Sequence, residues 1–148
     1  MPQRLVPLLF LVAACAGGSA GSAANSSPEN TVKAFLAAAR DTNTALMANY
    51  WGGPDGPAGQ TKKPADYEKR IDIMQRYLVN DSVSVVSIGK VSGSPDQVSV
   101  TVRIFRGNCR SLVPFTAGPW KHLWLIQDID LSAAGNPARK CDANGNPI

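Results

Sequence analysis

The sequence has 148 residues, of which 44% are apolar and 18% are charged. This length and composition are typical of one globular domain and argue against an intrinsically disordered chain. The formal net charge is +4, and it falls to +3 if the N-terminal segment that contains Arg4 is removed. Such a mild excess of positive charge argues against nucleic acid as a partner, because nucleic-acid binders usually carry a denser basic surface.

The N-terminal segment has the features of an export signal. Residues 5–14 form an apolar run of ten residues after the positive charge of Arg4. This run has the length of a signal-peptide core and is too short to span a bilayer. It ends in the letters VAAC at Cys15, which resemble the bacterial lipobox. The resemblance implies that residues 1–14 are a lipoprotein signal peptide and that Cys15 becomes the lipidated N-terminus. The alternatives are a secretory signal cleaved after Ala24 and a chance match.

Lipid chains on Cys15 would hold the protein at a membrane. Ala16 occupies the next position, where an Asp favours retention at the inner membrane in enteric-type bacteria. The expected location is therefore the bacterial cell envelope, lipid-anchored at the outer membrane and facing the periplasm. Residues 15–26 comprise the lipidated cysteine and an uncharged stretch rich in Gly, Ala and Ser, which is typical of a flexible tether.

Helical periodicity predicts three helices after the tether. Ser27-Pro28-Glu29 combines an N-cap hydroxyl, a proline at the first helical position and a carboxylate in the first turn. A second helix is expected over residues 44–51, and a third from about residue 64 to residue 78, each with apolar residues at helical spacing. Residues 52–64 contain four Gly and three Pro, and are expected to be a loop.

After residue 81 the period changes to two, which predicts antiparallel strands. The expected strands cover residues 83–91, 98–105, 112–116 and 120–131, with turns at residues 92–96, 107–108 and 118–119. Pro114 indicates an edge or a bulge in the third strand. Residues 132–148 show no period and are expected to be an irregular tail.

Helices followed by a meander of strands predict an α+β fold, with three N-terminal helices packed on a curved antiparallel sheet of about four strands. Four segments show a likeness to a known superfamily: the opening SPENTVKAFLAAARDTNTALMANYW, the helix YEKRIDIMQRYL, the strand QVSVTVRIF and the late Gly-Pro-Trp. Their order in residues 27–131 resembles the nuclear-transport-factor-2-like superfamily, and more narrowly small bacterial lipoproteins with such a domain. The resemblance implies a cone-shaped domain. This superfold hosts isomerases, dehydratases, binding modules and assembly domains.

No catalytic residue is predicted, because no acid/base group matches a position of that superfamily. The groups that could act inside a cone are the single histidine, His122, together with Asp41, Tyr50, Tyr67, Tyr77, Asp128 and Asp130. Helix capping explains Asp41, and exposure at a strand end explains Asp128 and Asp130. An isomerase- or dehydratase-like enzyme with a Tyr/Asp/His site is the alternative hypothesis. No cofactor is predicted, and no metal site, because one histidine without clustered carboxylates cannot supply three ligands.

Two sets of side chains are candidates for binding. Strand alternation would place Trp120, His122 and Trp124 on one face, where with Tyr50 they would line an apolar pocket around a group that titrates near neutrality. The same side chains could instead cover the sheet under a helix or in a dimer contact. An anion patch for a lipid headgroup or a sugar phosphate is the second candidate, with an ordinary solvated sheet face as its alternative. The patch comprises Arg103, Arg106, Arg110 and Lys121.

Two cysteines remain if Cys15 is lipidated. Cys109 and Cys141 have 31 residues between them, and an even pair in an exported protein predicts a disulfide. Closing a loop of this size contributes on the order of 3–4 kcal/mol in the chain-entropy model. Free thiols or intermolecular pairing are the alternatives. Neither cysteine belongs to a CxxC motif, which argues against a redox enzyme.

These observations lead to a hypothesis about the functional class of the protein. The chain is expected to be a lipid-anchored cell-envelope protein of non-enzymatic type that binds a small ligand or a partner protein close to the membrane. The N-terminal lipid would attach the protein to the membrane. A homodimer formed through the open sheet face is a further candidate for the protein partner.

Overall fold

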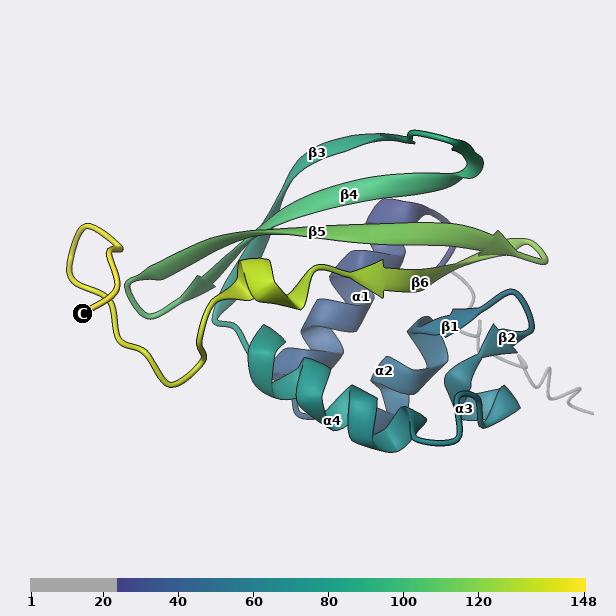
Figure 1. Ribbon diagram of the computed structural model, residues 1–148, viewed down its shortest axis with the longest axis horizontal. Helices are drawn as coiled ribbons and strands as arrows, with labels where there is room; N and C mark the ends of the chain where they lie inside the picture. The colour runs from purple at the N-terminus through teal and green to yellow at the C-terminus, as the bar shows by residue number, and fades with distance from the viewer. Residues whose placement is uncertain (1–23) are drawn as a thin grey trace, which may run out of the picture.

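The computed structural model describes residues 24–148, so that the predicted signal peptide and Cys15 lie outside the described residues. Within this range the fold is α+β, as predicted: helices cover one face of a four-stranded antiparallel sheet (Figure 1). The helices are α1 (Pro28–Arg40), α2 (Thr44–Tyr50), α3 (Ala58–Thr61) and α4 (Tyr67–Leu78), and the short 3-10 helix η1 (Leu131–Ala134) follows the sheet. The strands of the sheet are β3 (Ser82–Val91), β4 (Ser94–Arg106), β5 (Cys109–Trp120) and β6 (Leu123–Ile129), in the order β3-β4-β5-β6.

The prediction of three helices, all before the sheet, needs correction. The described chain has four α-helices before the sheet, and η1 comes after it. The narrower expectation of a cone-shaped nuclear-transport-factor-2-like fold stays a prediction. None of the described helices is both long and apolar enough to cross a membrane.

The first two helices begin where their capping residues predict. The Ser27 hydroxyl accepts the backbone N–H of Asn30 at 3.1 Å, and Pro28 opens α1. The side chain of Asn43 accepts the N–H of Leu46 at 3.0 Å at the start of α2. Each cap satisfies a backbone donor that the first turn of a helix leaves without an intrahelical acceptor. The local sequence therefore sets the starting points of both helices.

The core lies between α1, α2, α4 and the sheet, and apolar side chains fill it. Phe35 of α1 meets Phe115 of β5 edge-to-face, with ring centroids 6.5 Å apart, and both side chains are fully buried. Val100 pairs with Phe115, and Val102 pairs with Val113, on the same face of the sheet. The opposite face carries the alternate residues, and none of the described helices covers it (Figure 1).

The third strand is longer than predicted. β5 covers 12 residues and continues through Gly118 and Pro119, where a turn is expected from the sequence. The turn lies instead at Lys121 and His122, because Trp120 still pairs with Leu123. Pro114 lies where β6 ends, since the β5–β6 pairing begins only at Phe115. β5 is an inner strand between β4 and β6, and the N–H of Asp130 donates to the carbonyl of Pro114 at 3.1 Å, so the proline does not lie on an edge strand.

Residues 52–64, expected to be a loop, contain three short elements. The strands β1 (Gly52–Gly53) and β2 (Gly56–Pro57) form a small hairpin, and α3 follows at once. Gly56 has a φ of +128°, and a Cβ at this position would lie 3.0 Å from the indole of Trp120. The N–H of Ala58 donates to the carbonyl of Trp51 at 2.8 Å. Contacts with distant residues therefore order this segment, which has no periodicity of its own.

Candidate functional site

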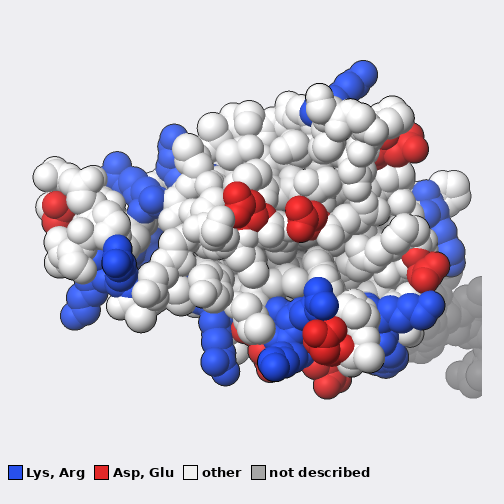
Figure 2. Space-filling model, in the orientation of Figure 1, with Lys and Arg blue, Asp and Glu red and all other residues white. Residues whose placement is uncertain are grey.

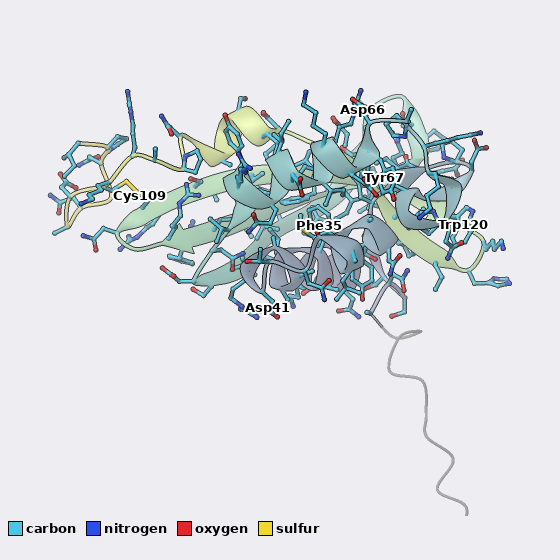
Figure 3. The ribbon with its side chains drawn as sticks, turned by 90° about the horizontal axis from the view of Figure 1, so that it is seen from below. Phe35, Asp41, Asp66, Tyr67, Cys109 and Trp120 are labelled. Atoms are coloured by element: carbon cyan, nitrogen blue, oxygen red, sulfur yellow. A yellow bond between two sulfur atoms is a disulfide. The ribbon has the colours of Figure 1, made fainter. Side chains whose placement is uncertain are left out.

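The four residues of the predicted anion patch do not gather in one place. Arg103 of β4 pairs with Leu112, and Arg110 of β5 pairs with Phe105, on the uncovered face of the sheet. Arg106 lies on the other face, at the end of β4. Lys121 lies in the β5–β6 turn, about 35 Å away along the strand. Figure 3 shows the ends of β5, Cys109 and Trp120, on opposite sides of the molecule.

Arg106 instead belongs to a hollow at the end of the sheet, which we call the basic hollow. It has a volume of about 330 Å³ and lies between the β4–β5 turn and the C-terminal tail. Its lining residues are Arg106, Gly107, Asn108, Cys109, Pro137, Arg139, Lys140 and Cys141. In the space-filling view, basic side chains gather at this end of the molecule (Figure 2).

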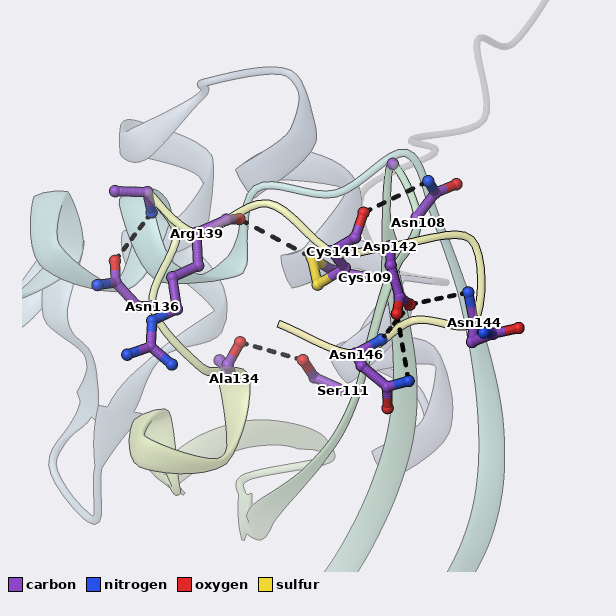
Figure 4. Close-up of a disulfide and its surroundings, with 12 residues drawn as sticks. Asn108, Cys109, Ser111, Ala134, Asn136, Arg139, Cys141, Asp142, Asn144 and Asn146 are labelled. Carbon is purple, nitrogen blue, oxygen red and sulfur yellow. Dashed lines mark hydrogen bonds between the residues drawn. A yellow bond between two sulfur atoms is a disulfide. The ribbon is translucent and has the colours of Figure 1, made fainter. Parts of the chain in front are cut away.

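The predicted pair of cysteines closes the basic hollow. Cys109 and Cys141 lie at disulfide distance, with their Cα atoms 5.2 Å apart. The side-chain amide of Asn108 donates to the carbonyl of Cys141 at 3.4 Å (Figure 4). The pair therefore joins the tail to the start of β5, and places Arg139 and Lys140 beside the β4–β5 turn.

The cations of the basic hollow have no carboxylate partners within residues 24–148. The ion pairs of the described chain lie elsewhere, between Lys33 and Glu29, Arg40 and Asp41, Lys63 and Asp55, and Arg70 and Asp66. Arg106 donates from Nη1 to the carbonyl of Tyr77 at 3.3 Å. Its Nε is buried and has no hydrogen-bond partner among residues 24–148. Unpaired guanidinium and ammonium groups in one hollow can hold an anion.

The carboxylate of Asp142 organises the tail beyond the disulfide. It accepts the backbone N–H groups of Asn144 and Asn146, each at 2.9 Å (Figure 4). The hydrogen bond from the Asn146 backbone is the largest of the effects that hold the pKa of Asp142 below its ordinary value of 3.8. A carboxyl group with a lowered pKa in the folded state stabilises that state above its unfolded pKa. This contribution is lost as the pH falls through the folded pKa.

We therefore expect the turn at residues 142–146 to loosen only in acid. In a pH titration followed by NMR, the backbone amide signals of Asn144 and Asn146 should shift together with a midpoint below 3.8. Asp142→Asn should remove this titration and serves as the control. A midpoint above 3.8 for the wild-type protein would contradict the hydrogen bonding described for this turn.

A second hollow, which we call the helical cleft, lies between α2, α3 and α4. Its volume is about 490 Å³, and Ala48 and Ile71 form a buried part of its wall. Its other lining residues are Thr44, Ala45, Asn49, Gly59, Lys62, Tyr67, Glu68 and Asp72. A Cβ on Gly59 would come within 2.8 Å of the Asn49 side chain, so this glycine permits the close approach of α3 to α2.

The rim of the helical cleft carries both signs of charge. The ammonium of Lys62 donates to the hydroxyl of Tyr67 at 3.4 Å and lies 5.6 Å from the centre of its ring. The Tyr67 hydroxyl donates in turn to Glu68 at 3.1 Å. Lys62 is therefore already engaged by groups of the cleft itself. This differs from the unpaired cations of the basic hollow.

The structure separates the four residues of the predicted apolar pocket. Tyr50 is buried in the core. His122 is exposed in the β5–β6 turn, so that it does not alternate with Trp120 and Trp124 in a strand as expected. Trp120 is half-buried against Gly56, with the ammonium of Lys121 4.7 Å from the centre of its ring. The N–H of Trp124 donates to the carbonyl of Asn25 at 3.0 Å.

The acid/base groups considered for an enzyme lie at scattered positions. Tyr50 is buried and Tyr67 is half-buried, whereas the remaining groups are exposed on different elements. The exposed groups are Asp41, Tyr77, His122, Asp128 and Asp130. Within residues 24–148, no three His, Cys, Asp or Glu side chains are grouped so that they could hold a metal ion.

Sequence reasoning missed Arg139 and Lys140 as candidate binding residues. They lie in the tail, which shows no period, and directly precede Cys141. The predicted cysteine pair was the available signal. A bridge from Cys141 to Cys109 necessarily brings its two basic neighbours close to the β4–β5 turn.

Comparison of this chain with protein-family models, with curated proteins and with solved structures finds no match in any of the three.

Proposed function

We propose that this chain is a lipid-anchored protein of the bacterial cell envelope that binds a small ligand without acting on it chemically. The anchor is a lipidated Cys15, which follows a signal peptide of residues 1–14. The protein is held at the outer membrane and faces the periplasm. Binding of a partner protein, including a second copy, is the other form of the same proposal.

The pairing of Cys109 with Cys141 is the observation that carries this proposal. Disulfides persist in the oxidising envelope and are rare in the cytosol. The pair also accounts for two of the three cysteines in the sequence and leaves Cys15 available for lipidation. The letters VAAC at the end of an apolar run of ten residues support the same reading.

The finer fold proposed is the cone of the nuclear-transport-factor-2-like superfamily. The order of helices before a four-stranded meander supports it. Apolar side chains occupy the space between helices and sheet, which favours binding on the outside of the domain. The basic hollow and the helical cleft both lie there, and both have charged rims.

The anchor is tested with Cys15→Ala in the bacterial host. We expect this variant to lose fatty-acid labelling and to appear in the soluble fraction, because the thiol that accepts the lipid is absent. Ser22→Ala, in the tether, should retain label and membrane association. Fatty-acid labelling of Cys15→Ala equal to that of the wild type would refute the proposal.

A further inference from the structure

We propose that the basic hollow binds a small oxyanion of the phosphate type, held by Arg106, Arg139 and Lys140. This inference rests on the proposed function in one respect, since it names the ligand class for the small-ligand binding stated above. It does not depend on the lipid anchor. It replaces the anion patch expected along the sheet with a different set of residues at one end of the sheet.

Charge is the first argument. Three cations line one hollow of about 330 Å³, and none of them has an ion pair with a described residue. Two nearby side-chain carboxylates are occupied by other donors. Asp81 accepts the backbone N–H of Gly107 at 2.6 Å, and Asp142 accepts the amides of its own turn. Like charges without counterions raise the local potential, which attracts an anion.

The guanidinium of Arg106 is the second argument. Its Nη1 donates to the carbonyl of Tyr77 at 3.3 Å, whereas its Nε is buried without a hydrogen-bond partner in the described part of the chain. Arg106 lines the hollow, and the hydrogen bond to Tyr77 holds its guanidinium beside that space. The planar fork of arginine suits phosphate and carboxylate oxygens.

The disulfide is the third argument, because it holds the residues of the hollow together. Arg139 and Lys140 come from the tail and Arg106 from β4, more than 30 positions apart in sequence. The Cys109–Cys141 pair and the hydrogen bond from Asn108 to Cys141 hold these segments together. The backbone of Gly107 and Asn108 lines the hollow between them. Separation of the two cysteines would therefore remove two of the three cations.

The other surfaces of the domain give weaker evidence for a bound ligand. In the helical cleft, Lys62 already contacts Tyr67, and both signs of charge are present. The uncovered face of the sheet is open, but nothing in the structure indicates what would cover it. The basic hollow combines an open space of about 330 Å³ with three cationic side chains that have no ion pair with a described residue.

The proposal is tested by titrating the full-length protein, purified in detergent, with inorganic phosphate and separately with glycerol phosphate, the soluble headgroup of a phospholipid. Isothermal calorimetry should show saturable binding of at least one of them. Arg106→Gln and Lys140→Gln should each weaken this binding at least tenfold, since each removes a cation from the hollow. The matched control is Arg76→Gln, which removes an exposed arginine of α4 and should change the affinity less than twofold.

The two probes distinguish the sources of the anion. Tighter binding of glycerol phosphate indicates a lipid headgroup, and equal or tighter binding of inorganic phosphate indicates a free oxyanion; both outcomes support the site. Lys140 is exposed on the tail, so that Lys140→Gln keeps the test valid if Arg106→Gln fails to fold. Absence of saturable binding, or unchanged affinity in Lys140→Gln, would overturn the proposal. Neither result bears on the anchor, which the labelling of Cys15 decides separately.

Discussion

Replacement of Phe115 by alanine is expected to lower the free energy of unfolding by about 3–5 kcal/mol. Phe115 is fully buried at the centre of the sheet, where it pairs with Val100 and meets Phe35 edge-to-face. Its removal leaves a cavity between α1 and β5 that the close-packed surroundings fill only in part. Chemical denaturation followed by circular dichroism measures the change.

Phe105→Ala is the matched control for this experiment. Phe105 is a phenylalanine in the neighbouring strand, but it is half-buried on the uncovered face of the sheet, where it pairs with Arg110. Its replacement should therefore cost clearly less than that of Phe115. A larger loss of stability for Phe105→Ala than for Phe115→Ala would mean that the core lies on the other face of the sheet.

Loss of the disulfide is expected to have the second large effect. The double replacement Cys109→Ser and Cys141→Ser should lower the free energy of unfolding on the order of 3–4 kcal/mol, because the unfolded chain is no longer constrained by the cross-link. Denaturation without reductant measures this difference from the wild type.

Reductant provides the control for the disulfide. It should destabilise the wild-type protein by a similar amount and leave the double variant unchanged. Mass spectrometry without reduction should also recover Cys109 and Cys141 in one cross-linked peptide. Alkylation of both thiols in the native, unreduced protein would show that the bridge is absent.

Much of the fold could be predicted from local patterns. The cap at Ser27, the proline at the next position and the apolar face of α1 all indicate the same helix. The regular alternation from Val98 to Phe105 marks β4, whose two faces differ in burial. Local propensity and tertiary packing agree in both elements, which is why sequence reasoning succeeds there.

Sequence reasoning failed where distant contacts decide the structure. The hairpin of β1 and β2 lies beside the indole of Trp120, which is more than 60 positions away from Gly56 in the sequence. The turn at Lys121 and His122 interrupts an apolar run, and Lys121 adopts a positive φ of 55° without being a glycine. Lys121 and His122 are polar, but neither is a residue type that typically marks a turn. The predicted pocket around His122 was lost for this reason.

The binding residues were predictable only in part. Arg106 was identified, but with the wrong neighbours, because strand register was needed to separate it from Arg103 and Lys121. Arg139 and Lys140 reach Arg106 through the pairing of Cys141 with Cys109. A site assembled from a sheet end and an aperiodic tail leaves no periodic pattern in the sequence.

The most direct test of the central claim is mass spectrometry of the N-terminal peptide of the mature protein, purified from membranes of the bacterial host. The account predicts a peptide that begins at Cys15 and carries the mass of lipid chains. A peptide that begins at Asn25 without lipid, as expected for a secretory signal cleaved after Ala24, would contradict it.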